Sequence, residues 1–238
     1  MLVSYFILPT RRSPFLNVSE LVIKTNIPEQ TLRRIPYYHQ ILAEIEQTGN
    51  AFVSSKVLAN HFNIEDTQVR KDVSVIGYKG KPKTGYSVTG LKQAIAEFLG
   101  INYKNNTILI GAGKLGSALS EYPGLADYGL ELVGVFDKDP KKTGKRLGNC
   151  VIQPMESINS LLKYKQVGIA IITVPKAAAQ EACNTVIAHG IRAIWNFVPI
   201  RIAVPPDIIV RNENMAVGLA ILSHYLKSRN PYSPKLKD

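Results

Sequence analysis

Short runs of consecutive apolar residues alternate, in the second half of the chain, with segments whose apolar residues recur at helical spacing. The continuous runs predict buried strands at Thr107–Ile110, Leu130–Phe136, Val167–Thr173 and Arg192–Phe197. The other segments predict helices near Leu115–Tyr122, Met155–Tyr164 and Lys176–His189. Alternating strands and helices are typical of a parallel sheet covered on both faces, so this half is expected to form a doubly wound α/β domain.

The first half shows helical spacing instead. The apolar residues of Pro28–Gly49 predict a first helix that Gly49 ends. Ser54 or Ser55 is expected to cap a second helix. Asn63 tolerates a left-handed turn and is expected to end that helix.

A third helix is predicted at Thr67–Ile76, capped by Asp66 and closed by Gly77. Two short helices joined by a turn of about four residues form a helix-turn-helix, a DNA-binding motif. The exposed face of the third helix carries four polar residues. They are Gln68, Arg70, Lys71 and Ser74.

A segment rich in lysine and glycine, Lys79–Tyr86, follows this motif and predicts the tip of a hairpin. Such a hairpin beside a recognition helix would act as a wing. Leu91–Leu99 predicts a fourth helix ended by Gly100, and Ile101–Asn106 predicts a linker.

Both ends of the chain carry unusual apolar segments. Residues 1–27 begin with an apolar stretch that lacks the charge and cleavage site of a signal peptide, so they are expected to form a poorly ordered extension. No apolar run reaches the roughly 20 residues that a membrane span needs. The last predicted helix, Met215–Arg229, is too apolar for a helix exposed on one side.

The composition is that of an ordinary globular protein with a basic bias: 45% of its 238 residues are hydrophobic, and the net charge is +11. This charge favours an anionic partner such as nucleic acid, an acidic membrane face or a phosphorylated ligand. Cys150 and Cys183 lie far apart and the histidines are scattered, so a metal site is not expected and a reducing cytoplasm fits best.

The strand Thr107–Ile110 runs directly into a Gly-x-Gly-x-x-Gly motif. Gly111 permits the tight turn, Gly113 lets the backbone approach a pyrophosphate, and Gly116 lets the helix pack on the strand. The helix N-terminus offers free N–H groups to the phosphates. The expected dinucleotide-binding residues here are Gly111, Ala112, Gly113, Lys114, Leu115 and Gly116.

Asp137 follows the next predicted strand. A carboxylate at this point can accept both hydroxyls of an adenosine ribose and disfavours a 2′-phosphate, which favours NAD(H) over NADP(H). Asp137 and Lys138 are expected to bind the cofactor, although Lys138, Lys141 and Lys142 weaken the preference for NAD(H). The alternative is a solvated aspartate at a strand end.

The ends of the third and fourth strands are also expected to line the nucleotide crevice. A dehydrogenase usually needs a polar acid or base near the nicotinamide, and the sequence offers no clear set. His189 is expected to cap a helix C-terminus instead, so an enzyme is not predicted. The strand-end residues expected at the crevice are Thr173, Val174, Pro175, Asn196 and Phe197.

Five segments together resemble the Rex family of bacterial redox-sensing transcriptional repressors, over about residues 30–225. They lie at residues 68–74, 111–116, 134–140, 173–180 and 196–199. The resemblance implies a homodimer of chains with a winged-helix DNA-binding domain, a Rossmann domain for NAD(H) and a C-terminal helix swapped onto the partner. It also implies a palindromic operator from which NADH releases the protein.

The resemblance assigns DNA contacts to Arg70 and Lys71 and places Tyr122 near the nicotinamide. The family usually has an aromatic residue at the partner's nicotinamide pocket where this chain has Met215. Asn214 and Gln40 stand where the family has an Asp–Arg pair, and Pro82-Lys83 replaces an Arg-Gly in the wing. With the wing included, the expected DNA-binding residues are Gln68, Arg70, Lys71, Ser74, Lys81, Lys83 and Tyr86.

The sequence therefore predicts a cytoplasmic, homodimeric repressor that binds double-stranded operator DNA and senses the NADH/NAD⁺ ratio, without a metal or a membrane partner. Three alternatives stay open: a divergent paralogue with a weakened redox response, a nicotinamide-dependent oxidoreductase, and a coenzyme A-binding protein. The expected units are an extension at 1–27, a winged helix at 28–100, a Rossmann domain at 101–212, a swapped helix at 213–229 and a tail at 230–238.

Overall fold

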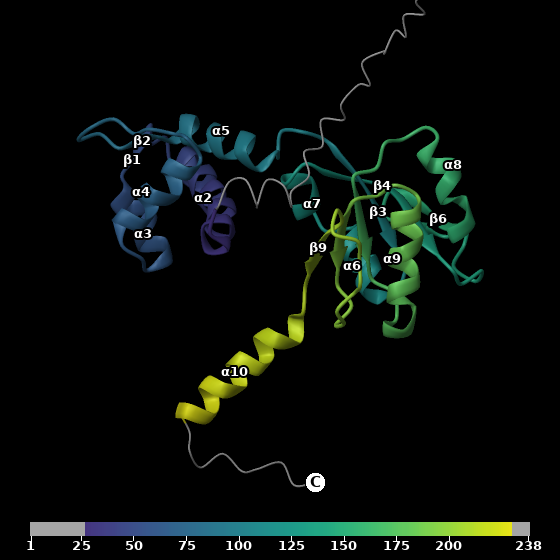
Figure 1. The fold of residues 1–238 in the computed structure, drawn as a ribbon. Helices are drawn as coiled ribbons and strands as arrows, with labels where there is room; N and C mark the ends of the chain where they lie inside the picture. The colour runs from purple at the N-terminus through teal and green to yellow at the C-terminus, as the bar shows by residue number, and fades with distance from the viewer. Residues whose placement is uncertain (1–26, 230–238) are drawn as a thin grey trace, which may run out of the picture.

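The computed structural model describes residues 27–229, which form two packed units and a projecting helix (Figure 1). The N-terminal unit is mostly helical, and the second unit is built around a large sheet. The extension before residue 27 and the tail at 230–238 lie outside the described residues. Among the described helices, none is both long and apolar enough to cross a bilayer.

The N-terminal unit has the predicted winged-helix pattern. Its helices are α2 (Glu29–Gln47), α3 (Ser55–Phe62), α4 (Asp66–Val75) and α5 (Val88–Leu99). A two-stranded antiparallel sheet joins β1 (Phe52–Val53) to β2 (Tyr86–Ser87) and forms the base of the wing. These two-residue strands were not predicted, because they are too short to show a pattern of alternation.

The helix ends confirm most of the predicted capping. The Ser54 hydroxyl accepts the Val57 N–H at 3.2 Å, and Asn63 adopts the left-handed conformation with φ 51°. The prediction that Asp66 caps α4 was wrong. Asp66 is the first helical residue, after the N-cap residue Glu65, and its carboxylate accepts hydrogen bonds from the side chains of Ser55 on α3 and Arg70 one turn later in α4.

A single apolar core holds the winged helix together. One side of α2 contributes Ile35, Tyr38 and Leu42, which are fully buried. They pack against the apolar stripes of the other three helices, at Leu58, Val69, Val73, Leu91 and Ile95. Because α4 contributes Val69 and Val73 to this core, its opposite side, which carries Arg70, Lys71 and Ser74, faces solvent.

The second unit is a seven-stranded sheet in the order β5-β6-β4-β3-β7-β8-β9, parallel except for β5. The four predicted strands are present as β3 (Asn105–Ile110), β4 (Leu130–Asp137), β7 (Ile169–Ile172) and β8 (Ala193–Asn196). The sequence did not predict the three outer strands, which are β5 (Arg146–Leu147), β6 (Cys150–Pro154) and β9 (Ile209–Asn212).

Helices cover both faces of this sheet, as the alternation predicts. In β3, Ile108 and Ile110 face one apolar cluster and Leu109 faces the other. The first cluster lies under α8 (Ile158–Leu162) and α9 (Ala179–Ala188), which short turns η1 (Met155–Ser157) and η2 (Lys176–Ala178) precede. The second lies under α6 (Lys114–Ser120) and α7 (Gly124–Asp127). This is the Rossmann-like, doubly wound arrangement.

The last helix, α10 (Met215–Arg229), projects away from both units (Figure 1). Its large apolar side chains are exposed, with Leu219 at 67%, Leu222 at 59% and Leu226 at 69%. Within one chain nothing covers these residues among those the structure describes, so α10 presents an unpartnered apolar surface.

Candidate nucleotide and DNA sites

The three motif glycines have different surroundings. Gly111 has φ +100°, and a Cβ there would lie 2.9 Å from the carbonyl carbon of Thr173. A Cβ on Gly116 would lie 2.1 Å from the Gly111 oxygen, so both positions require glycine. At Gly113 a Cβ would meet nothing within 4 Å, and the backbone there is open to a ligand.

The Thr173 hydroxyl fixes the turn from the neighbouring strand by donating to the Gly111 oxygen at 2.7 Å. Thr173 follows β7, which pairs with β3. The glycine turn therefore lies at the carboxyl ends of adjacent parallel strands, the edge at which ligands bind in such sheets.

Asp137 ends β4 beside this turn and is only 6% exposed. Its carboxylate accepts the backbone N–H groups of Ala112 and Asp139 and the ammonium of Lys142, each at 2.8 Å. Burial by itself raises the pKa of this carboxyl group. The Lys142 hydrogen bond and the two N–H donors outweigh burial and hold the pKa of Asp137 below its ordinary value. The site therefore keeps a buried negative charge at neutral pH.

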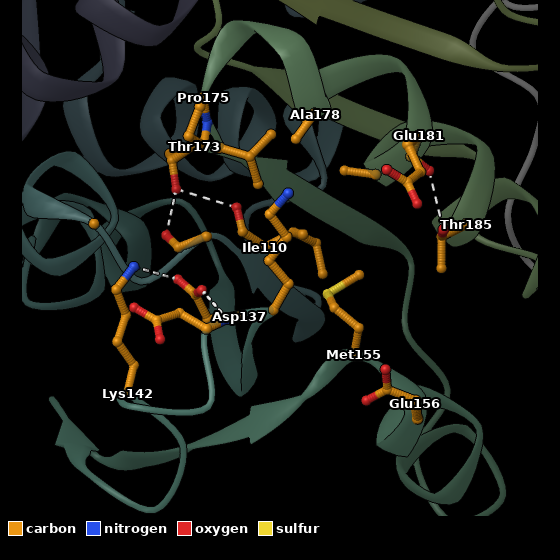
Figure 2. Close-up of a pocket in the computed structure, with 16 residues that line it drawn as sticks. Ile110, Asp137, Lys142, Met155, Glu156, Thr173, Pro175, Ala178, Glu181 and Thr185 are labelled. Carbon is orange, nitrogen blue, oxygen red and sulfur yellow. Dashed lines mark hydrogen bonds and ion pairs between the residues drawn. The ribbon is translucent and has the colours of Figure 1, made fainter.

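A cavity of about 610 Å³ opens from the glycine turn along η2 and α9 (Figure 2). This volume is within the range of small-molecule and cofactor sites. Seven of the predicted residues border it: Gly111, Gly113, Asp137, Lys138, Thr173, Val174 and Pro175. The sequence did not assign others that border it, which include Asp139, Lys142, Met155, Glu156, Glu181 and Thr185.

A second, more open hollow lies on the other side of the glycine turn. It is bordered by Ala112, Gly113 and Lys114 of the motif and by Ser117 of α6. Leu115 and Gly116 border neither hollow, and Gly116 is buried against the Gly111 oxygen. The six motif residues are thus divided between two ligand-accessible hollows and the packing of α6.

The remaining predicted cofactor residues do not border the cavity. The Asn196 side chain is buried, accepts the Val198 N–H at 2.9 Å and donates to Asn212 at 2.8 Å. Phe197 packs against Trp195, with the ring centroids 4.6 Å apart. Tyr122 is 56% exposed next to α7, and Met215 begins α10. Roles of these residues toward a cofactor stay predictions.

The exposed face of α4 and the wing together border a third hollow of about 670 Å³. Arg70 and Ser74 of α4 line one side, and Lys81 and Lys83 line the other. Lys71 is also exposed on α4. The structure thus brings cations from two separate segments to one surface, as a DNA backbone requires.

Two of the predicted DNA-binding residues point inward. Tyr86 is 8% exposed in the winged-helix core, and burial raises the pKa of its hydroxyl. The Gln68 amide donates to Asp72 at 3.0 Å. Contacts of Tyr86 and Gln68 with DNA stay predictions, because neither side chain lies free on the surface.

Asp72 is a fully buried carboxylate at the centre of a hydrogen-bond network, and the sequence did not single it out. Arg34 donates to both of its oxygens, at 2.6 and 2.9 Å. Thr31 and Tyr38 also donate, at 2.9 and 2.8 Å. Because these three partners lie on α2, the network fixes the recognition helix α4 to α2.

We expect Asp72→Asn to destabilise the protein by about 3 kcal/mol, because it removes the charge that compensates the partly buried Arg34. Chemical unfolding followed by circular dichroism measures this loss. Asp66→Asn, which disrupts the more exposed pair with Arg70 on the same helix, is the matched control and is expected to change stability little. Equal stability of the Asp72→Asn variant and the wild type would contradict the structural role of the network.

The same network predicts an acid sensitivity. Burial by itself raises the pKa of Asp72, but hydrogen bonds from Arg34, Gln68, Tyr38 and Thr31 lower it below the ordinary value of 3.8. A depressed pKa contributes stability above the pKa of the unfolded chain, and that contribution is lost as the pH falls through the folded value. Unfolding free energies measured from pH 6 down to about 2 should fall less steeply for Asp72→Asn than for the wild type.

Gln40 and Asn214 each form a hydrogen bond within this chain. The Gln40 amide of α2 donates to the Tyr128 hydroxyl at 3.0 Å, which joins the two units. Asn214 accepts the Ala216 N–H at 3.1 Å at the start of α10. A separate ion pair joins Arg211 of β9 to Glu29 of α2 at 3.3 Å. Among the described residues, no cluster of three or more His, Cys, Asp or Glu side chains could hold a metal ion.

Two family models match the chain in separate regions. Residues 26–74 match the putative DNA-binding protein N-terminus family. Residues 102–200 match the CoA binding domain family. These ranges coincide with the first helices of the winged-helix unit and with the greater part of the large sheet.

Relatives and solved structures cover both regions at once. The redox-sensing transcriptional repressor Rex of Treponema denticola is 39% identical, over 84% of this chain and 95% of the relative. The structure of RSP with β-NAD⁺ and operator DNA superposes with a TM-score of 0.81, at 30% identity, covering 87% of this chain and 95% of RSP. RSP with β-NADH gives 0.77 at the same identity, covering 87% and 97%. This chain is therefore a member of the Rex family of redox-sensing transcriptional repressors.

Proposed function

We propose that this protein is a homodimeric repressor that binds operator DNA through α4 and the wing, and that NADH lowers its operator affinity. The supporting observation is that one chain joins a basic helix-turn-helix surface to a dinucleotide-type cavity ending in a buried carboxylate. Its relative RSP has been solved with β-NAD⁺ and operator DNA and with β-NADH. We place its action in the cytoplasm, where DNA and a pool of nicotinamide nucleotides meet.

The residues present fit NAD(H). The open backbone at Gly113 leaves room for the diphosphate, and the ionised Asp137 is placed to accept ribose hydroxyls. The apolar side chains of Ile110, Met155 and Val174 line the interior of the cavity, which suits an adenine ring. The nicotinamide would act as a ligand whose charge and shape differ between its two redox forms.

The central test measures operator binding with NADH, with NAD⁺ and with neither. The duplex is one that the wild-type protein selects from a random library, and we expect its sequence to be a palindrome. NADH should weaken binding by about tenfold or more, the range of typical coupling energies, whereas NAD⁺ should not. Equal affinity under all three conditions would support a divergent repressor with a weakened redox response, which Gln40 and Asn214 motivate.

The exposed apolar helix α10 supports the dimer, because a second copy of this chain would bury it. We expect the double variant Leu219→Glu, Leu226→Glu to be monomeric, since it places charges in that buried surface. Light scattering after size exclusion measures the mass of both proteins. Tyr164→Glu adds a charge at another exposed aromatic residue and should leave the dimer intact. A dimeric α10 variant would refute the assignment.

Coenzyme A is the second candidate ligand, because residues 102–200 match a CoA binding domain. Coenzyme A carries a phosphate on the adenosine ribose, and the buried charge of Asp137 would repel it. Titrations with NADH and coenzyme A separate the two, and we expect binding of NADH alone. We also propose that the protein acts as a regulator and not as an enzyme, so NADH should be stable in its presence with common carbonyl substrates.

A further inference from the structure

One cation stands between the two hollows beside the glycine turn. Of the residues that border the 610 Å³ cavity, only Gly113 and Lys142 also border the second hollow. The backbone at Gly113 is the open point at which a diphosphate would approach. Lys142 therefore lies along the path that a dinucleotide must follow from one hollow to the other.

In this structure the Lys142 ammonium is held by Asp137 (Figure 2). It donates to Oδ2, and the same oxygen also accepts the Ala112 N–H. The other oxygen accepts the Asp139 N–H. A carboxylate oxygen with two donors has little capacity left for a third. Oδ1 can accept one ribose hydroxyl beside the Asp139 N–H, whereas a second hydroxyl that binds Oδ2 competes directly with Lys142.

The backbone of Lys142 is fixed while its side chain can reorient. Its N–H donates to the Asp139 oxygen at 3.0 Å, and its own carbonyl accepts the Lys145 N–H at 3.1 Å. A lysine ammonium on a four-carbon stem can exchange one anion for another without movement of these turns. The charged groups that border the second hollow with it are Lys114 and Glu121.

We propose that Lys142 is a positioning residue for the dinucleotide. Asp137 holds its ammonium until the ribose hydroxyls take that carboxylate, and the ammonium then binds the diphosphate beside Gly113. This inference rests on the proposed NAD(H) function. The ammonium would add a full charge to the partial positive charge that the first turn of α6 offers the phosphates.

The test titrates the full-length protein with ADP-ribose and with adenosine by calorimetry. We expect Lys142→Met to weaken ADP-ribose binding by about tenfold, the loss of one charge-assisted contact. Adenosine has the ribose but no phosphate, so its binding should be unchanged or slightly tighter, because the competitor for Asp137 is gone. Lys141→Met is the matched control, since that side chain is exposed one residue away, and it should change neither affinity.

The two ligands separate this role from a structural one. Equal weakening of ADP-ribose and adenosine would overturn the inference, because Lys142 would then only support Asp137 or the fold. Tighter binding of ADP-ribose would also overturn it, because Lys142 would then only obstruct the cavity. Lys142→Arg, which keeps the charge, should retain most of the ADP-ribose affinity. A wild-type protein that binds neither NADH nor ADP-ribose would instead refute the proposed function.

Discussion

Replacing Arg70 and Lys71 together with alanine is expected to abolish specific operator binding, with an affinity loss of roughly 100-fold or more. Both residues lie on the exposed side of α4, whose opposite side is anchored in the core by Val69 and Val73. Their loss therefore removes donors to bases and phosphates and leaves the helix in place. Fluorescence anisotropy with the selected duplex measures the affinity, and repeating it over a range of salt concentrations should give a shallower dependence for the variant.

Two controls separate a DNA contact from a general loss of charge. Lys163→Ala with Lys165→Ala also removes two cations, from the segment that follows α8 and belongs to neither α4 nor the wing. This control should keep most of its operator affinity. NADH affinity of the Arg70, Lys71 variant should equal that of the wild type. Retained operator binding by that variant would remove the helix-turn-helix assignment.

Gly113→Val is expected to reduce NADH affinity by about 100-fold without destabilising the protein. The backbone there is extended, with φ −85° and ψ −172°, and a Cβ would meet no atom within 4 Å. Valine can therefore occupy this position in the folded protein, where its methyl groups fill the space over the turn that a diphosphate needs. The variant should still bind operator DNA, and NADH should no longer release it.

Gly116→Val, in contrast to Gly113→Val, is expected to destabilise the folded protein. Its Cβ would lie 2.1 Å from the Gly111 oxygen, so the turn or α6 must shift and the melting temperature should fall. Thermal unfolding and NADH titration of both variants distinguish a blocked site from a damaged one. Unchanged NADH affinity in Gly113→Val would show that the phosphates do not pass over this turn.

The parts of the fold that the sequence predicted are those with strong periodicity. The four central strands are continuous apolar runs because helices bury them on both faces. The missed strands lie at the two edges of the sheet. β6 has one buried residue, Ile152, β9 is partly exposed, and β5 has only two residues, so none shows a long apolar run. Helix boundaries were close, but Asp66 was misassigned because a carboxylate before an apolar stripe resembles a cap.

Site residues whose type is required by the local backbone were predicted from the sequence. Residues whose role depends on a partner far away in the chain were missed. Glycines of the turn and Asp137 have fixed positions relative to a strand end. In contrast, the direction of a polar side chain at a strand end depends on its neighbours. The Asn196 side chain accepts the Val198 N–H and therefore turns inward. Asp72 is one of several charged residues on α4, and only the return of α2 with Arg34 and Tyr38 makes it buried.

The buried hydrogen-bond network at Asp72 restricts the movements by which nucleotide binding could change the position of α4. Since α4 is bonded to α2 through a desolvated charge, a tilt of α4 alone would break this network, and we expect α4 and α2 to move together. The covalent connection of the N-terminal unit to the sheet is short, from Gly100 to Lys104. In a twofold dimer that spans half-sites about 34 Å apart, a rotation of a few degrees at this connection is amplified by the length of the unit. In the proposed dimer, both α4 helices would then lose register with successive major grooves at the same time.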